Sequence, residues 1–258
     1  EHLGFQGPRA SITTACSSSA TSIAYGAELI KSGQADLMAC GGGEALSELT
    51  FGGFCSLQVV DPLPCRPFDA RRKGLTLGEG AAVLILEDKE RALGRGARIY
   101  GELLGSSLGG EAYHITAPEE TGKEEARIIS EALHDAGVKP QEVDYINAHG
   151  TGTILNDQVE TLAIKAVWGE EAHQIPVSST KSMIGHCLGA AGGLEAVASL
   201  LAIQHHFIPP TAGFERGDEV CDLDYYPQPK STEVRIALSN SFAFGGNCTT
   251  LVFGTGYR

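Results

Sequence analysis

Apolar and polar positions along the chain follow two spacings, one typical of strands and one typical of helices. Short apolar runs bounded by glycine predict strands, and apolar residues three or four positions apart predict helices. The helical spacing that begins near Ala20 runs up to Gly33, which is expected to end that helix. The predicted strands lie at residues 11–14, 37–40, 81–86, 98–104, 143–148, 176–179, 234–240 and 249–254. The predicted helices lie at residues 20–30, 87–96, 124–136, 157–168 and 188–204.

This alternation predicts an α/β fold in layers, with a buried sheet. The last two strands are expected to form a hairpin around Gly245 and Gly246. Residues 11–30 and 176–197 resemble each other, because each runs from a strand through a tight polar turn into a helix of small residues. Such helices can pack closely against another backbone, so the two segments suggest two related halves around a buried centre.

The charge of the chain restricts its partners. There are 32 acidic residues against 19 lysines and arginines, which gives a net charge of −13. A surface of this charge repels phosphate backbones and anionic lipids, and no basic stripe is interleaved with aromatic residues. No apolar run approaches the roughly 20 residues that cross a bilayer. We therefore expect neither a nucleic-acid partner nor a membrane association.

Seven cysteines are scattered through the chain without any C-x-x-C pair. Their odd number and wide spacing fit neither a disulfide framework nor a structural zinc site. The histidines lack the spacing of H-E-x-x-H and similar motifs, so no metal is expected. This pattern favours a reducing cytoplasm, in which a free thiol can serve as a nucleophile.

Cys16 stands where a predicted strand gives way to a helix, and three serines follow it. Unpaired N–H groups and the positive end of a helix favour the thiolate, so the position suits a nucleophile. The alternative is an inert buried cysteine, which is the commoner role of a free thiol.

Two histidines lie in glycine-flanked turns of the same kind as the Cys16 turn. His149 follows a predicted strand and begins the sequence HGTGT, in which Thr151 and Thr153 offer hydroxyl groups to a ligand. His186 ends the sequence KSMIGH and precedes a predicted helix. A single histidine is usually structural, but two in matching turns at strand ends suggest a site, because α/β folds place functional groups there.

Charged residues accompany both histidines. Lys181, in the turn of the second histidine, is either a surface lysine or a charge that orients a histidine. Asp157 and Glu160 share one face of the helix after the first histidine, and an exposed acidic face is the usual explanation. The acidic segment at residues 119–125 is interpreted as a solvated loop and helix start.

Taken together, these segments resemble the β-ketoacyl-acyl-carrier-protein synthases, the condensing enzymes of the thiolase fold. They occur in the family's order and span nearly the whole chain. The matching segments are TACSSS around Cys16, RPFDARRKGLTLGEGA at 66–81, HGTGT at 149–153, KSMIGH at 181–186, GAAGGLEA at 189–196 and FAFGGN at 242–247. The resemblance implies a thiolase-like layered αβαβα fold of two similar halves.

The chemistry that the resemblance implies agrees with the residue types. Cys16 would take an acyl group from a carrier-protein or coenzyme A thioester, which gives an acyl-enzyme. A malonyl thioester would then lose carbon dioxide. His149 and His186 would donate hydrogen bonds to its oxygen as the enolate forms, and the resulting carbanion would attack the acyl-cysteine.

Supporting roles follow from the same resemblance. Phe244 would provide a backbone N–H to the oxyanion hole, and its side chain would be a mobile gate between the acyl pocket and the malonyl site. Lys181 would orient and tune the site through the neighbourhood of Glu160. Thr151 and Thr153 would contact the substrate.

The resemblance also implies the partners. No bound cofactor is expected, because the phosphopantetheine group arrives on the acyl carrier protein. The expected partners are that carrier protein, the acyl and malonyl thioesters, and a second subunit in a homodimer or a heterodimer with a related chain.

Two positions depart from the family pattern. Ala243 precedes Phe244 where many relatives have glycine, which is expected to stiffen that loop. Lys73 stands where relatives often carry aspartate. Thiolases, the sister family, fit less well, because they use a second cysteine in a C-x-G motif and Cys248 is followed here by two threonines.

Two other functions remain open. A Cys-His hydrolase would admit water to the acyl-cysteine and release a free acid. A non-catalytic partner subunit would leave Cys16 unacylated, although the reactive positions are all intact.

The start of the chain bears on the domain organisation. Residues 1–96 resemble only the end of an N-terminal thiolase-like half that carries the nucleophile, and residues 97–258 resemble a complete C-terminal half that carries both histidines. Much of the first half is therefore expected to be absent from a chain that begins at Glu1, and the whole fold is expected to need roughly 400 residues. The missing N-terminal part of the fold is a further expected partner.

Overall fold

A five-stranded mixed sheet lies at the centre of the structure, a computed structural model that describes residues 4–256. Its strands, in order across the sheet, are β3 (Glu102–Gly110), β9 (Asn247–Gly254), β8 (Ile236–Ala243), β4 (Tyr145–Asn147) and β5 (Val177–Ser178). β4 is parallel to both of its neighbours, whereas β9 is antiparallel to both of its own. β8 and β9 form a hairpin that closes at Phe244–Gly246, as the sequence predicts.

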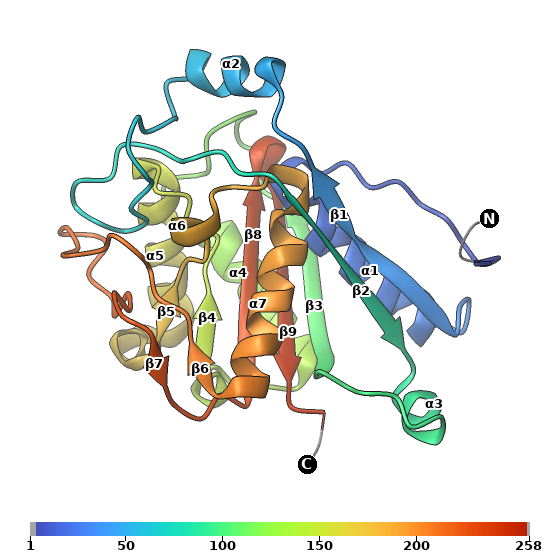
Figure 1. Cartoon of the computed structure of the whole chain (residues 1–258). Coiled ribbons are helices and arrows are strands. Elements are labelled where there is room, and N and C mark those ends of the chain that lie inside the picture. Colours follow the sequence, from blue (N-terminus) through green and yellow to red (C-terminus); the bar gives the residue numbers. More distant parts are fainter. Residues whose placement is uncertain (1–3, 257–258) are drawn as a thin grey trace.

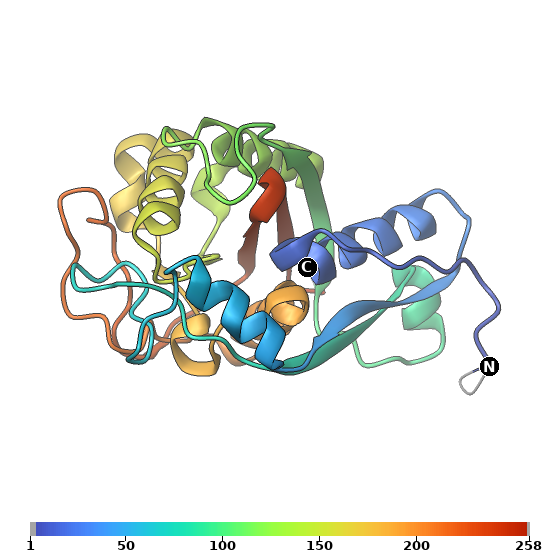
Figure 2. The same ribbon diagram turned by 90° about the horizontal axis from the view of Figure 1, so that it is seen from above.

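Helices cover both faces of this sheet (Figure 2). α4 (Lys123–Ala136) and α5 (Ile154–Trp168) lie on one face, and α1 (Ser18–Lys31) and α7 (Ala191–His205) lie on the other. A two-stranded antiparallel sheet of β1 (Leu37–Glu44) and β2 (Gly80–Glu87) packs on the outer side of α1 and α7. The described residues thus form layers in the order helix, sheet, helix, sheet.

Short elements connect these layers (Figure 1). They are α2 (Glu48–Ser56), α3 (Lys89–Gly94), α6 (Lys181–Ile184), the paired strands β6 (Phe207–Ile208) and β7 (Lys230–Ser231), and 3-10 turns at Ala15–Ser17, Pro140–Glu142, Gly169–Gln174, Leu188–Ala190 and Phe244–Gly246.

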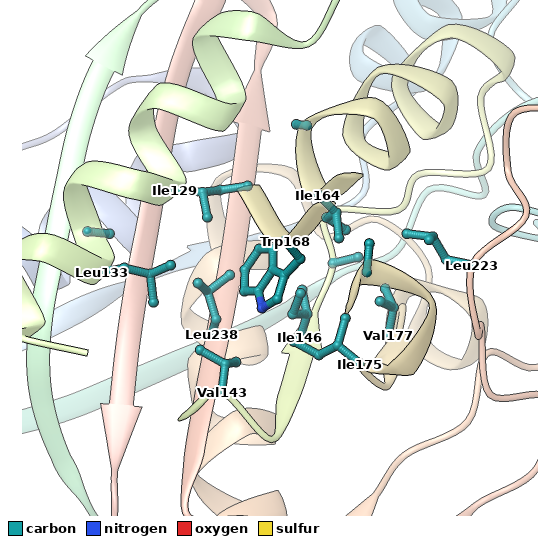
Figure 3. Close-up of a cluster of buried hydrophobic side chains, with 14 of the residues drawn as sticks. Ile129, Leu133, Val143, Ile146, Ile164, Trp168, Ile175, Val177, Leu223 and Leu238 are labelled. Carbon is teal, nitrogen blue, oxygen red and sulfur yellow. The ribbon is translucent and has the colours of Figure 1, made fainter. Parts of the chain in front are cut away.

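Two apolar cores lie on the two faces of the five-stranded sheet. The first, under α4 and α5, surrounds Trp168 (Figure 3). The indole N–H of Trp168 donates a hydrogen bond to the Pro140 carbonyl at 2.7 Å. The second, under α1 and α7, includes Ile23. Adjacent β8 residues alternate between the cores, with Leu238 in the first and Ala237 in the second, because successive side chains of a strand point to opposite faces.

Most of the predicted elements are confirmed. The five predicted helices correspond to α1, α3, α4, α5 and α7, and the last four predicted strands correspond to β4, β5, β8 and β9. Gly33 and Gly137 adopt the left-handed conformation just beyond α1 and α4, which explains why each helix ends there.

Two predictions about the elements are wrong, and one helix was missed. Residues 11–14 form no strand, and the strand predicted at 98–104 lies further on, at β3. β3 is rich in glycine, which usually disfavours a strand, but a Cβ at Gly105 would lie 2.3 Å from the backbone nitrogen of Ala136 in α4. The sequence analysis did not predict α2. This helix buries no residue, so it lacks the periodic apolar positions that indicate a helix.

The sheet of β1 and β2 is only half covered, although residues 81–86 form a continuous apolar run. Ala82 is buried, whereas Val83 is 67% exposed and Ile85 is 54% exposed. A continuous apolar run predicts burial on two faces, and within residues 4–256 only the face toward α1 and α7 is packed.

Two further predictions concern the start of the chain and its association with membranes. Glu1, where the sequence begins, lies outside the described residues. Between residues 4 and 256, no helix combines the length and the apolar character that a membrane crossing requires.

The two similar segments of the sequence share the turn and the helix, but only the second contains the predicted strand. α1 and α7 each follow a 3-10 turn that starts with a non-glycine residue at positive φ, Ala15 at 49° and Leu188 at 43°. The helices cross so closely that a Cβ at Gly192 would lie 2.6 Å from the Cβ of Ala20 and 2.8 Å from its backbone nitrogen. The small residues are therefore needed for this contact.

Gly192→Ala is expected to lower the free energy of unfolding by about 1–3 kcal/mol, because the added methyl group forces α1 and α7 apart. Urea-induced unfolding measures the change. Gly52→Ala in α2 is the matched control, because a Cβ there meets no atom within 4 Å and alanine favours a helix. Equal stability of the Gly192 variant and the control would contradict the close packing.

Candidate active site

Cys16 is the middle residue of the 3-10 turn before α1, and its side chain is buried. The left-handed conformation of Ala15 is strained for a non-glycine residue, so the surrounding packing must hold this turn in place. The sulfur lies against the β8–β9 hairpin, where the backbone N–H groups of Phe244 and of Cys16 itself face it and lower its pKa. Two converging N–H groups can also stabilise an oxyanion that forms at this position.

The Cys16 thiol is harder to ionise than the sequence predicts. Burial raises its pKa to about 11, although the charge of Lys181 and the two backbone N–H groups act in the opposite direction. Glu195 contributes a smaller increase. The sequence predicts that the helix start favours the thiolate, but the structure favours the neutral thiol. The reason is that α1 begins two residues later, at Ser18, and desolvation of the thiol outweighs the effect of the N–H groups.

His149 and His186 lie next to each other, although 37 positions separate them in the sequence. His149 follows β4, His186 lies in the loop between α6 and α7, and both side chains are buried. Their ring centroids are 5.4 Å apart and the planes meet at 84°. The two similar turns therefore converge on one place.

The hydrogen bonds of both histidines fix the position of the ring proton. The backbone N–H of Leu188 donates to Nδ1 of His186 at 3.3 Å, and Nζ of Lys181 lies 3.2 Å from Nδ1 of His149. A nitrogen that accepts cannot carry the proton, so each ring is protonated at Nε2. Burial lowers the pKa of both histidines well below the usual range, and Lys181 lowers it further. Both rings are therefore neutral N–H donors.

Lys181 is buried, so the alternative of a surface lysine is excluded. Its amine donates to the carbonyl oxygen of His149 at 2.6 Å and forms a very short ion pair with Glu195. The sequence interpretation connected Lys181 with the neighbourhood of Glu160, and both side chains contact the His149 loop, but the carboxylate that pairs with the amine is Glu195 of α7. The buried amine therefore orients the His149 loop with Glu195 as its counter-charge.

Glu160 holds the same loop from the opposite side. Its carboxylate accepts hydrogen bonds from the backbone N–H groups of His149 at 2.9 Å and Gly150 at 2.8 Å, and from the Asn240 amide at 3.1 Å. Asp157 and Glu160 are both fully buried, so the expected exposed acidic face is wrong. Burial raises the pKa of Glu160 to about 7, and the three donated hydrogen bonds limit that increase.

A cavity of about 320 Å³ connects the predicted site residues. Its lining includes Cys16, His149, His186, Thr151, Thr153 and Phe244, whereas Lys181 and Glu160 lie behind the wall. The hydroxyl groups of Thr151 and Thr153 are 2.8 Å apart and can reach a polar ligand together. Lys73, one of the departures from the family pattern, also lines this cavity.

The Phe244 ring stacks on Phe54 of α2, with ring centroids 5.8 Å apart and an interplanar angle of 18°. Phe54 also lines the cavity. α2 has no fully buried residue, and Phe54 in this stack is partly buried.

Sequence reasoning missed Phe54 and Glu195. The signal for Glu195 is present in GAAGGLEA, since a single acid among small residues in a closely packed helix must find a buried partner. The signal for Phe54 is absent, because nothing in the local pattern of α2 shows that it covers the cavity.

The potential metal ligands do not converge around Cys16. Within residues 4–256, the three-residue cluster of donor atoms consists of Glu111, Glu125 and Cys248, and its Glu111 is the member that reaches the cavity lining.

Two protein-family models match the chain. The β-ketoacyl synthase N-terminal domain matches residues 1–92, and the β-ketoacyl synthase C-terminal domain matches residues 100–215. The curated relatives include a 3-oxoacyl-[acyl-carrier-protein] synthase 2 from Synechocystis sp., 49% identical over 98% of this chain and 62% of the relative. Nodulation protein E from Rhizobium meliloti is 47% identical over 97% of this chain and 63% of the relative.

Solved structures give the same result. A type II PKS acyl-carrier protein in complex with its ketosynthase and a hexaketide matches with a TM-score of 0.93 and 39% identity, over 96% of this chain and 63% of the matched chain. The ishigamide ketosynthase/chain length factor matches with a TM-score of 0.90 and 44% identity, over 94% of this chain and 60% of the matched chain. The chain belongs to the β-ketoacyl synthase family and has its thiolase-like fold. It spans about 62% of the length of the Synechocystis relative.

The raised pKa of Cys16 predicts how its reactivity depends on pH. Between pH 7 and pH 10 the alkylation rate with iodoacetamide is expected to rise about tenfold per pH unit, because only the thiolate reacts and its fraction rises toward a pKa of about 11. Peptide mass spectrometry follows Cys16 separately from the other thiols. A rate that levels off below pH 8 would show that the N–H groups outweigh burial.

Lys181→Met is expected to destabilise the fold by about 3–5 kcal/mol, because it leaves Glu195 buried without a counter-charge. The double variant Lys181→Met/Glu195→Gln should recover a large part of this loss, since it removes the orphaned charge. Urea-induced unfolding of the two single variants and the double variant gives the coupling. Additive losses would mean that the amine and the carboxylate act independently.

Proposed function

We propose that this chain carries out decarboxylative Claisen condensation, in which an acyl group on Cys16 reacts with a malonyl-acyl-carrier-protein thioester to give a 3-ketoacyl thioester. The observation that carries the proposal is the combination of one buried thiol, two backbone N–H donors and two neutral imidazole N–H donors around a single cavity. Relatives named 3-oxoacyl-[acyl-carrier-protein] synthase 2 support it.

In the first step, the sulfur of Cys16 attacks the carbonyl carbon of an acyl thioester. The N–H groups of Cys16 and Phe244 stabilise the oxyanion of the tetrahedral intermediate. The carbon–sulfur bond to the carrier then breaks, and the carrier thiol leaves with the proton that Cys16 gives up. The high pKa of Cys16 means that proton loss accompanies the attack.

In the second step, the malonyl thioester loses carbon dioxide, and the electron pair of the broken bond moves into an enolate. His149 and His186 donate hydrogen bonds from Nε2 to the enolate oxygen. The enolate carbon attacks the acyl-cysteine carbonyl, and the Cys16 thiolate leaves as the new carbon–carbon bond is completed. Neutral donors suit this step, because an imidazolium could protonate the carbanion.

The remaining residues have positioning roles in this proposal. Lys181 and Glu160 hold the His149 loop from two sides. Thr151 and Thr153 contact the phosphopantetheine arm, which arrives on the acyl carrier protein, so no separate cofactor is needed. Phe244 gates the cavity by leaving its stack on Phe54.

Partners and location form part of the same proposal. The matched ketosynthase in complex with its acyl-carrier protein supports a carrier partner, and the matched ketosynthase/chain length factor supports a dimer with a related subunit, with a homodimer as the other form. The free cysteines support a reducing cytoplasm.

We further propose the division into an N-terminal part at residues 1–96 and a C-terminal half at residues 97–258, which the two family matches support. The open face of β2, with Val83 and Ile85, is suited to be covered by another segment of protein, and the Synechocystis relative is longer than this chain.

Incubation with acyl-carrier-protein and malonyl-carrier-protein thioesters tests the function. The expected product is a 3-ketoacyl thioester, accompanied by the mass of one acyl group on Cys16. Release of free acid alone would identify a hydrolase, and Cys16 that resists acylation would identify a non-catalytic subunit. Either result would overturn the proposal.

His149→Ala and His186→Ala are each expected to reduce malonyl decarboxylation by about 10²–10³-fold, the usual loss for one electrophilic donor. Acylation of Cys16 should persist in part, because its oxyanion is held by backbone N–H groups. Carbon dioxide release and intact-protein mass measure the two steps separately. His134→Ala is the control, since this histidine lies in α4 away from the cavity lining. Loss of acylation with normal decarboxylation would contradict the assigned roles.

A further inference from the structure

Glu125 is a buried acid that faces a second carboxyl group, that of Glu111. It is the third residue of α4, its side chain is fully buried, and neither carboxyl oxygen has a hydrogen-bond partner. The sequence placed it in a solvated segment at residues 119–125, so its burial is a correction. Burying a carboxyl group in this way is costly unless a proton or a cation compensates for its charge.

Two other potential ligands converge on Glu125. Glu111 comes from the loop after β3, and Cys248 is the second residue of β9. The donor atoms of all three side chains lie within 4.8 Å of one another, and Sγ of Cys248 is 3.8 Å from a carboxyl oxygen of Glu111. A tetrahedral zinc ion with one thiolate and two carboxylate ligands needs ligand separations of about 3.4–3.6 Å, which follows from its bond lengths. Small side-chain shifts therefore produce that geometry.

We propose that Glu111, Glu125 and Cys248 bind one divalent metal ion of the zinc class. A thiolate ligand selects zinc, cobalt or cadmium over magnesium and calcium, which prefer oxygen ligands alone. Glu111 lines the main cavity, so an ion can enter from there and take a water molecule as its fourth ligand. This site is separate from Cys16 and the two histidines, and its binding test does not depend on the proposed reaction.

The ionisation of these groups agrees with a site that exchanges protons for a cation. Burial raises the pKa of Glu125 to about 9, and the neighbouring Glu111 carboxyl contributes further. Burial also raises the pKa of Cys248 well above its usual value, and the charges of Glu125 and Glu111 add to it. Metal binding releases the Cys248 thiol proton and the Glu125 carboxyl proton to solvent, so the affinity rises with pH.

The other charged groups near Glu111, Glu125 and Cys248 do not oppose the binding of a cation. Arg127 acts on Cys248 as a positive charge, but its guanidinium is paired with Glu124 and Glu131 at the surface. Glu160 adds negative charge near Glu125.

Metal binding has a consequence for the cavity. The backbone N–H of Glu111 donates to the Gly246 carbonyl at 3.0 Å, within the hairpin that carries Phe244. An ion that joins Glu111 to Cys248 of the same hairpin cross-links the cavity wall to the segment that bears the gate. Occupancy is therefore expected to restrict the movement of this hairpin.

Cobalt(II) titration of the full chain at pH 8 tests the site. One equivalent of bound cobalt is expected, with thiolate-to-cobalt charge-transfer absorption that added zinc removes. Cys248→Ser should abolish the absorption, and Glu125→Gln should weaken binding at least about tenfold. Cys40→Ser is the matched control, because Cys40 is an equally buried strand cysteine whose pKa is shifted by burial and Ser22, with no carboxylate acting on it.

Several outcomes would overturn the inference. They are the absence of charge-transfer absorption, absorption that persists in Cys248→Ser, and absorption that disappears in Cys16→Ser instead, which would place the metal among the catalytic residues. Circular dichroism checks that each variant is folded. Glu125→Gln is nearly isosteric and removes a buried acid, so it keeps the test valid if the cysteine variant fails to fold.

Discussion

The site depends on one buried interaction, the contact of the Lys181 amine with Glu195 and with the His149 loop. The amine donates to the His149 carbonyl and to Nδ1 of its ring, while Glu195 balances its charge. Burial lowers the pKa of both His149 and His186, and the positive charge of Lys181 lowers it further. The donor character of the His149 ring therefore depends in part on a lysine that does not line the cavity.

The position of Lys181 depends in turn on how closely the helices pack. Glu195 belongs to α7, which can approach α1 because Gly192 lies against Ala20. α1 follows the turn that holds Cys16, so one helix contact sets the distance between the nucleophile and the counter-charge of the lysine. Any side chain larger than glycine at position 192 would force α1 and α7 apart and separate the thiol from its electrostatic environment.

The hairpin of β8 and β9 connects the cavity to the rest of the molecule. Its turn provides the Phe244 N–H and the Phe244 ring, and its second strand begins with Cys248 next to Glu111 and Glu125. A change in protonation or in metal occupancy at those carboxyl groups acts on the same turn that faces Cys16. The β8–β9 hairpin therefore contacts both the cavity around Cys16 and the buried acids Glu111 and Glu125.

The sequence by itself determined the layered α/β class, most helix limits and the candidate residues Cys16, His149 and His186, because these depend on local spacing and on glycine-bounded turns. Tertiary structure decided the partner of Lys181, the ionisation of Cys16 and the cluster around Glu125. A pKa is set by burial and by charges from distant segments, and neither is encoded in local spacing. The α7 carboxylate beside Lys181 is 14 residues away, and Cys248 is 123 residues from Glu125. Only the folded chain brings such groups together.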